Sequence, residues 1–128
     1  MKIKTQELND AALDWAVAKA ADYLSRLGDH WMVTLPGVHA RMNFVPGPRC
    51  VFSPSTRWAQ GGPLIEREKF DVVYQAGGRG DEWTCFANDA DDDLNSIEAG
   101  GPTPLVAAMR CFITSQLGDE VDIPEELT

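Results

Sequence analysis

Residues 101–118 read GPTPLVAAMRCFITSQLG and give the clearest structural signal in the chain. Thr103 is a residue type that caps helices, and Pro104 suits the first helical position, where no N–H is needed. Gly118 ends the pattern, because glycine readily adopts the left-handed conformation that follows many helices. We predict an amphipathic helix over 104–117, since apolar side chains recur at helical spacing as Leu105, Ala108, Met109, Phe112, Ile113 and Leu117.

A second helical pattern lies near the N-terminus, where Asn9 or Asp10 can cap a helix. Its apolar stripe consists of Leu13, Ala16, Val17, Ala20, Tyr23, Leu24 and Leu27. The charged residues fall largely off that stripe, namely Asp10, Asp14, Lys19, Asp22 and Arg26. Trp15 lies off the centre of the stripe, which predicts a place at the rim of the core. Gly28 follows, so we predict a helix over about 9–27.

Two segments between these helices are typical of strands. Residues 70–75 (FDVVYQ) are β-branched and aromatic, and residues 82–87 (EWTCFA) alternate between two faces. The AGGRGD turn between them (76–81) lacks the phosphate-loop pattern GxxxxGK[ST]. We therefore predict an antiparallel hairpin.

The remaining segments give weaker signals. Residues 2–4 and 30–35 suit short strands, and residues 63–69 suit a short helix or turn that begins at Pro63. We expect 29–62 to be irregular apart from the strand, because Pro and Gly recur there, and 88–101 to form an acidic loop. The predicted class is α+β, with a small, mostly antiparallel sheet covered by the two amphipathic helices.

The charge balance argues against one broad class of partner. The 128 residues include 11 basic and 20 acidic side chains, which gives a net charge of −9. Proteins that bind DNA or RNA need a basic surface to neutralise phosphates, and the sequence has no basic cluster. We therefore expect no nucleic-acid partner. The acidity is compatible with a basic protein partner, or with an anionic ligand held by a few local arginines.

The distribution of apolar residues and cysteines indicates in which cellular compartment the protein is expected. No stretch approaches the roughly 18 apolar residues of a membrane span, and residues 1–8 lack the apolar core of a signal peptide. Cys50, Cys85 and Cys111 are odd in number and widely spaced, unlike a disulfide framework. We expect a single cytoplasmic domain over 1–128 with free thiols and no membrane association.

The motifs of metal and cofactor chemistry do not match. In an EF-hand register that begins at Asp89, Leu94 stands where glycine is needed and Gly100 where a bidentate glutamate is needed. His30 and His39 lack a zinc-binding spacing. No GxSxG-type nucleophile motif is present. We therefore expect no metal and no cofactor, and we assign no catalytic residue.

The most unusual segment is 55–66, which reads STRWAQGGPLIE. Trp58 offers a stacking surface, and Arg57 can pair with an anion. Gly61 and Gly62 allow a ligand or another part of the backbone to approach closely. These residues make the segment a candidate binding site. The alternative is a tight connection whose tryptophan fills the core beneath it.

Four further residues complete the candidate ligand-binding set. Gln60 and Glu66 add an amide and a carboxylate to the same segment. Thr103 marks a helix N-terminus, which exposes N–H donors to anions, although its side chain can cap them itself. Arg110 lies in the same predicted helix and can meet a phosphate group.

Four runs of sequence occur together and in a fixed order, namely ALDWAVAKA (12–20), SPSTRWAQGGPLIEREKF (53–70), GPTPLVAAMRCF (101–112) and LGDEVDIPEEL (117–127). In these runs the chain resembles the NinX-like family of bacteriophage and prophage accessory proteins. The resemblance implies expression in a bacterial host cell, from a gene near those for phage replication and recombination. It implies no activity, cofactor or catalytic residue.

Three hypotheses of function follow. The first is a non-enzymatic protein that binds, and thereby sequesters, a small anionic, nucleotide-like ligand at the candidate residues. The second is an acidic modulator that docks on a basic host or phage protein. The third is a small nucleotide-processing enzyme with Glu66 or an aspartate as base. Exposed tryptophans also favour a homo-oligomer.

Overall fold

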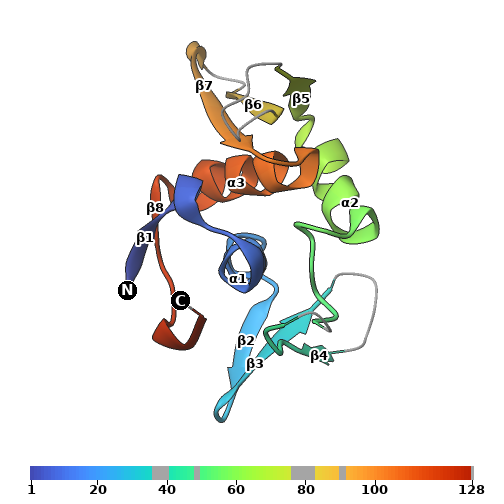
Figure 1. The fold of residues 1–128 in the computed structure, drawn as a ribbon, viewed down its shortest axis with the longest axis vertical. Helices are drawn as coiled ribbons and strands as arrows, with labels where there is room; N and C mark the ends of the chain where they lie inside the picture. The colour runs from blue at the N-terminus through green and yellow to red at the C-terminus, as the bar shows by residue number, and fades with distance from the viewer. Residues whose placement is uncertain (36–40, 48–49, 76–82, 90–91, 128) are drawn as a thin grey trace.

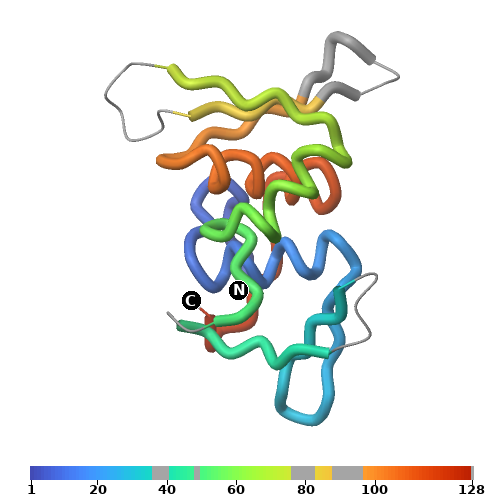
Figure 2. The backbone as a smooth tube through the Cα atoms, turned by 90° about the vertical axis from the view of Figure 1, so that its right-hand side faces the viewer, coloured from blue at the N-terminus to red at the C-terminus, as the bar shows by residue number. Residues whose placement is uncertain are grey.

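The computed structural model describes residues 1–35, 41–47, 50–75, 83–89 and 92–127 (Figure 1). Within these residues the chain forms three α-helices and three small antiparallel sheets, so the predicted α+β class is confirmed. The strands are divided among three sheets rather than gathered in one. Seen from the side, the helices lie between one sheet at the top of the molecule and another near the bottom (Figure 2).

Helix α3 (Pro104–Leu117) crosses the middle of the molecule and has the predicted bounds (Figure 1). The Thr103 hydroxyl caps it by accepting a hydrogen bond of 3.1 Å from the Val106 N–H. Gly118 follows with a φ of 93°, in the region that favours glycine. Local signals therefore determine both ends of this helix.

One sheet covers α3 from above in Figure 1. It contains β5 (Asp71–Tyr74), β6 (Trp83–Asp89) and β7 (Asp92–Gly101), in that order, and both pairs are antiparallel. The β5–β6 pair is the predicted hairpin. Its register places Val72 opposite Cys85, and Cys85 is fully buried against the helix side of the sheet.

The expected acidic loop over 88–101 is wrong, because most of this segment is strand β7. Ala99 pairs with Cys85, and Ile97 pairs with Ala87. Backbone groups form this ladder, so acidic side chains on a strand do not prevent it. The sequence expectation gave too much weight to the charges and too little to the alternation that buries Ala99.

Helix α1 (Asp10–Ala20) ends well before position 27, so the second predicted helix is too long. Asp22 has a φ of 63°, a left-handed conformation that stops a helix and that aspartate tolerates better than most residues. The chain then continues as strand β2 (Leu24–Leu27). The apolar stripe holds for the helix itself, but its last two leucines, Leu24 and Leu27, belong to this strand.

A second sheet lies below α1 in Figure 1. Strand β2 pairs with β3 (His30–Thr34), which confirms the predicted strand, and β4 (Arg41–Asn43) adds a third member. Gly28 has a φ of 62° between β2 and β3. It therefore forms a hairpin turn, where the sequence predicted the end of a helix.

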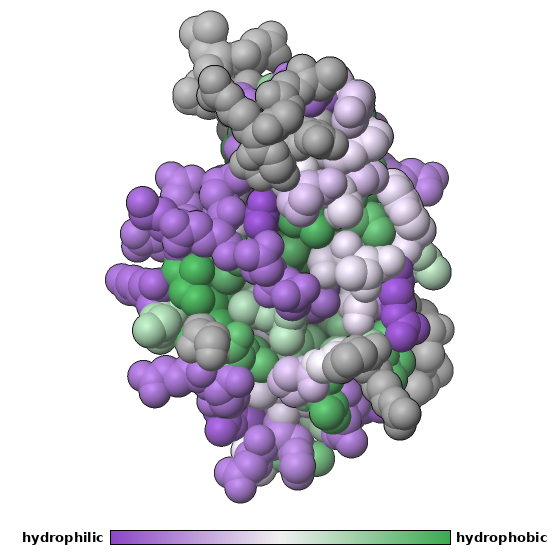
Figure 3. All heavy atoms as spheres, in the orientation of Figure 1, coloured by the Kyte–Doolittle hydropathy of each residue, from purple (hydrophilic) through white to green (hydrophobic). Residues whose placement is uncertain are grey.

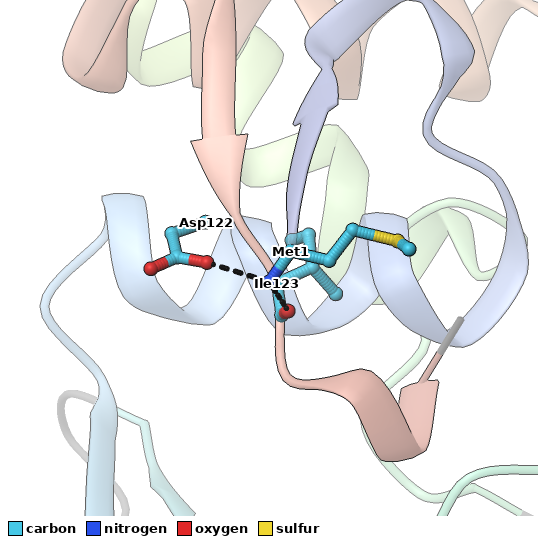
Figure 4. A network of polar contacts seen from close by, with 3 residues as sticks. All are labelled: Met1, Asp122 and Ile123. Carbon is cyan, nitrogen blue, oxygen red and sulfur yellow. Dashed lines mark hydrogen bonds and ion pairs between the residues drawn. The ribbon is translucent and has the colours of Figure 1, made fainter.

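The third sheet joins the two ends of the chain. Strand β1 (Lys2–Lys4), predicted as an edge strand, pairs with β8 (Glu120–Asp122). The amino group of Met1 donates to Asp122 Oδ1 at 2.9 Å and to the Ile123 carbonyl at 3.1 Å (Figure 4). Single 3-10 turns follow each strand, as η1 (Thr5–Glu7) and η2 (Glu125–Leu127).

Helix α2 (Trp58–Glu68) begins earlier than the predicted start at Pro63, which lies inside it. A proline has no N–H, so the Ala59 carbonyl lacks its usual helical donor. The proline is exposed, and water can satisfy that carbonyl. Lys69 ends the helix with a φ of 56°. Part of the segment that was expected to be irregular is therefore helical.

The core is centred on α1 and α3. Trp15 is only 3% exposed, so its predicted place at the rim is wrong, and its ring meets Trp31 edge to face at 5.4 Å. The largest side chains of this core that are almost fully buried are Phe52, Phe112, Leu8, Leu13, Met109, Ile113, Ile123, Val17 and Val33. Among the described residues, no helix combines the length and apolarity that crossing a bilayer requires.

Candidate functional site

Two adjoining hollows form a cleft between α1, the segment before α2, and the start of α3. The acidic hollow, of about 520 Å³, is lined by Asp10, Ala11, Asp14, Gly47, Cys50, Ser53, Ser55 and Thr56. The tryptophan hollow, of about 400 Å³, is lined by Asp10, Ser55, Thr56, Trp58, Thr103, Pro104, Leu105 and Val106. Three residues line both hollows, so the two are continuous.

Arg110 holds one wall of this cleft in place. Its Nε donates to the Leu8 carbonyl at 3.1 Å, and its Nη1 donates to the Gly100 carbonyl at 2.8 Å. Its Nη2 donates to Asn9 Oδ1 at 2.8 Å. The side chain is 5% exposed and does not line either hollow. Arg110 therefore ties the segment before α1 to the end of β7.

The loop before α2 is held by Gln60. The Gln60 side chain accepts from the Ser53 N–H at 2.6 Å and donates to the Val51 carbonyl at 2.7 Å. A Cβ at Gly61 would collide with the Pro54 carbonyl oxygen. The close approach predicted for this glycine is thus made by the protein's own backbone, and it lets α2 pack tightly against the loop.

Asp14 is a buried ionisable group that lines the acidic hollow. The residue is 5% exposed, and its Oδ1 accepts from the Ser55 N–H at 2.9 Å. Burial raises the pKa of the Asp14 carboxyl from 3.8 to about 6, hydrogen bonds from Ser55 partly oppose the rise, and the charge of Asp10 adds to it. Asp14 therefore gains or loses its proton close to neutral pH.

Sequence reasoning missed Asp14, because it placed the charged residues of this helix on a solvated face. Asp10 and Asp14 are four positions apart and share one face of α1. Asp14 is covered by Ser55 and its loop, which come from a distant part of the sequence, whereas Asp10 stays exposed. The spacing of the two carboxylates was the available signal, and it did not reveal that one of them would be covered.

Trp58 does not fill the core, so that alternative is wrong. Its side chain is 58% exposed at the first turn of α2 and lines the tryptophan hollow. Gly62 lies one turn later, and a Cβ there would come no closer to the Trp58 ring than 3.8 Å. The indole is thus an open platform beside the start of α3.

The other predicted residues lie at different distances from the cleft. Arg57 precedes Trp58, is exposed, and donates one long hydrogen bond of 3.4 Å to the Cys50 carbonyl. Thr103 lines the tryptophan hollow with the hydroxyl that caps α3. Glu66 is exposed near the far end of α2 and lines neither hollow.

Exposed apolar side chains are scattered over several elements outside the cleft. On the face drawn in Figure 3, apolar residues in green lie between hydrophilic ones in purple. The large hydrophobic residues with the greatest exposure are Met1, Leu27, Val45, Val51, Trp58, Val73 and Tyr74. Of these residues, Trp58 is the one that lines the cleft, where its neighbours are both apolar and polar.

Metal chemistry has no support in the described part of the chain, where no group of three or more His, Cys, Asp or Glu side chains could hold an ion. His39, Asp91 and the 76–81 turn lie outside the described residues. All three cysteines are free and buried.

Comparison with known families identifies the chain. The sequence model of the family described as "Bacteriophage P22, NinX" matches residues 4–116. The chain belongs to this family. The predicted resemblance is confirmed, and the chain is a phage accessory protein. The matched range includes all of α1 and α2 and nearly all of α3, and so every element that lines the cleft of this NinX-family chain. No curated protein matches the chain significantly.

Proposed function

We propose that this NinX-family chain is a non-enzymatic binding protein that holds a small nucleotide-like molecule in the cleft. The observation that carries the proposal is the position of Trp58. An indole that is more than half exposed lines a hollow whose other wall is the start of α3. Free tryptophan faces are costly to leave in water and are efficient platforms for planar ligands.

The polar groups around Trp58 suit the remaining parts of such a ligand. Thr56 and Thr103 bring hydroxyl groups to the tryptophan hollow. Arg57 is the exposed cation next to Trp58 in the chain; it lines neither hollow, and the one hydrogen bond that its side chain makes to a described residue is long, at 3.4 Å. Arg57 donates to the carbonyl of Cys50, which lines the acidic hollow, so a phosphate group paired with Arg57 lies at the edge of that hollow. Glu66 and Arg110 are not part of the proposed site.

Isothermal titration calorimetry with a panel of nucleosides and nucleotides tests the proposal. Stacking of one base on an aromatic side chain contributes about 1–3 kcal/mol, so Trp58→Ala weakens binding by roughly tenfold or more. Tyr74→Ala is the matched control, because Tyr74 is 55% exposed and lies on β5, away from the cleft. If no nucleoside or nucleotide binds, or if Trp58→Ala binds as well as the wild type, the proposal is overturned.

Asp14 supports a second candidate function, a small nucleotide-processing enzyme. A general base works best when its pKa lies near the working pH, and the pKa of Asp14 is about 6. Asp14 lines the cleft, whereas Glu66 does not, so Asp14 is the better candidate base. Chromatography of nucleotides after overnight incubation distinguishes the two functions, because a binding protein returns them unchanged.

The acidic modulator of a basic host or phage protein is supported by the net charge of −9. Such a complex weakens steeply with ionic strength, because its attraction acts between exposed charges. Pull-downs from infected cells at low and high salt test this alternative, and a partner retained only at low salt supports it.

A further inference from the structure

The described lining of the acidic hollow next to Trp58 is rich in acceptors of hydrogen bonds. Among its described lining residues, two are carboxylic acids, three carry hydroxyl groups and none is Lys, Arg or His. An anionic group is repelled from such a surface, and a group that donates hydrogen bonds is attracted. The part of a ligand that lies against Asp10 and Asp14 therefore carries N–H donors rather than a negative charge.

Asp14 has acceptor capacity beyond what the protein uses. In the described part of the chain its hydrogen bonds come from Ser55, which donates its backbone N–H at 2.9 Å and also its side-chain hydroxyl, so two acceptor positions are in use. An ionised carboxylate offers about four acceptor positions on its two oxygens. Two parallel N–H donors on a planar group fit a carboxylate best, because both oxygens are then used at once.

We propose that the acidic hollow recognises a base with two adjacent N–H donors, as guanine has at its ring N–H and 2-amino group, and that Asp14 accepts both. This inference rests on the proposed function, since Trp58 supplies the stacking surface for the same base. Asp10 lies one helical turn before Asp14 and shares the hollow, where it strengthens the preference for donors.

The other common bases lack this edge. Adenine and cytosine place a ring nitrogen acceptor beside their amino group, and the acceptor lone pair faces the carboxylate unfavourably. Uracil has a single ring N–H between two carbonyl oxygens. Hypoxanthine keeps the ring N–H of guanine and lacks the 2-amino group. A buried acceptor left without a partner weakens binding, so these bases are rejected relative to guanine.

Calorimetric titration with guanosine, inosine and adenosine at pH 7.5 tests the inference. Nucleosides are used because they carry no phosphate and report on the base alone. We expect guanosine to bind about tenfold more tightly than inosine, and adenosine to bind more weakly than guanosine by at least as much. Equal affinities for guanosine and adenosine, with both dependent on Trp58, overturn this inference and leave the proposed function intact. No binding of any nucleoside overturns this inference, and the proposed function is overturned as well only if the nucleotides also fail to bind.

Asp14→Asn is the decisive variant, because the amide oxygen still accepts from the Ser55 N–H while the amide NH₂ opposes the donors of guanine. We expect the preference for guanosine over inosine to fall to within twofold, and adenosine affinity to rise, because the amide NH₂ can donate to the ring acceptor of adenine. Glu120→Gln on β8 removes one exposed carboxylate outside the cleft and keeps the full preference. If Asp14→Asn does not fold, Asp10→Asn must reduce the preference at least twofold, and an unchanged preference in either variant counts against the inference.

Discussion

Helices α1 and α3, two of the three helices that border the cleft, begin in different ways. Helix α3 is capped by its own Thr103, whose hydroxyl accepts from the Val106 N–H. Helix α1 begins after Asn9, whose side chain makes no capping hydrogen bond to the helix. The Asn9 side chain instead accepts from Arg110, which lies 101 positions away in the sequence. The N-terminus of α3 is therefore determined by its own residues. The N-terminus of α1 depends on an arginine that lies far away in the sequence and reaches Asn9 only in the folded protein.

Removing Arg110 is expected to have the largest effect. Arg110→Ala leaves two backbone carbonyls and the Asn9 amide without their buried donor, so we expect a loss of roughly 3 kcal/mol or more in the free energy of unfolding. Urea denaturation followed by circular dichroism measures this loss. Arg110→Lys keeps the charge without the planar fork and is expected to lose less.

The matched control for Arg110 is Arg67→Ala. Arg67 is a half-exposed arginine paired with its neighbour Glu68, and exposed pairs of this kind contribute under about 1 kcal/mol. An Arg110→Ala loss as small as that of Arg67→Ala contradicts the view that α1 depends on the distant arginine.

The pH dependence of stability is expected to show a slightly smaller effect, centred on Asp14. Because its pKa is raised from 3.8 to about 6, its contribution to stability is complete below about pH 3.8 and is lost as pH rises through 6. The shift corresponds to roughly 3 kcal/mol between pH 4 and pH 8. Asp14→Asn does not titrate, so it gains that amount relative to the wild type over this range.

Urea denaturation of both proteins at several pH values measures this difference. Subtracting the two curves removes the contributions of the other carboxylates, which both proteins share. A difference that stays constant from pH 4 to pH 8 shows that Asp14 has an ordinary pKa, and it would remove the basis for an acid–base role.

A third effect concerns the contact of α2 with the start of α3. Gly61→Ala places a methyl group against the Pro54 carbonyl and the Leu105 side chain, so we expect a loss of about 2 kcal/mol. Gly62→Ala is the control, because its methyl group meets only the Trp58 ring at an ordinary distance of 3.8 Å. Alanine at this helical position raises stability by about 0.5–1 kcal/mol. Thermal unfolding that ranks the two variants in the opposite order contradicts this packing.

The smallest expected effect completes the comparison of the two helix starts. Thr103→Ala removes the local cap of α3 and costs about 1 kcal/mol, whereas Thr103→Ser retains the cap and costs little. Asn9→Ala is expected to cost more than Thr103→Ala, because it withdraws an acceptor from the buried Arg110. If Asn9→Ala and Thr103→Ala lower the free energy of unfolding equally in chemical denaturation, the N-termini of α1 and α3 differ less than their hydrogen bonds suggest.

The sequence predicted those parts of the fold that local chemistry determines. The bounds of α3 follow from Thr103, Pro104 and Gly118, and the β5–β6 hairpin follows from its strand composition. The end of α1 could not be predicted in this way, because the helical spacing of Leu24 and Leu27 is also compatible with a short strand. A single left-handed residue, Asp22, decides between the two.

The candidate site was predictable only in part. The segment 55–66 was singled out for its residue types, and Trp58 does line a hollow. Gln60 and Gly61 belong to the same segment, yet their contacts are with the protein itself. Asp14 is held at the site by a hydrogen bond from the Ser55 N–H, which lies 41 positions away in the sequence. Contacts between residues so far apart in the sequence leave no local pattern in a single sequence.

The pairing of β1 with β8 has a consequence for the order of folding. The Met1 amino group and its Asp122 partner are 121 positions apart, so this contact closes nearly the whole chain into one loop (Figure 4). Closing a long loop is entropically unfavourable until other contacts have shortened it. We expect the helices around α3 to pack first and the two chain ends to pair last. The same short sheet should then open first, and its amide hydrogens should exchange with solvent sooner than those of α3.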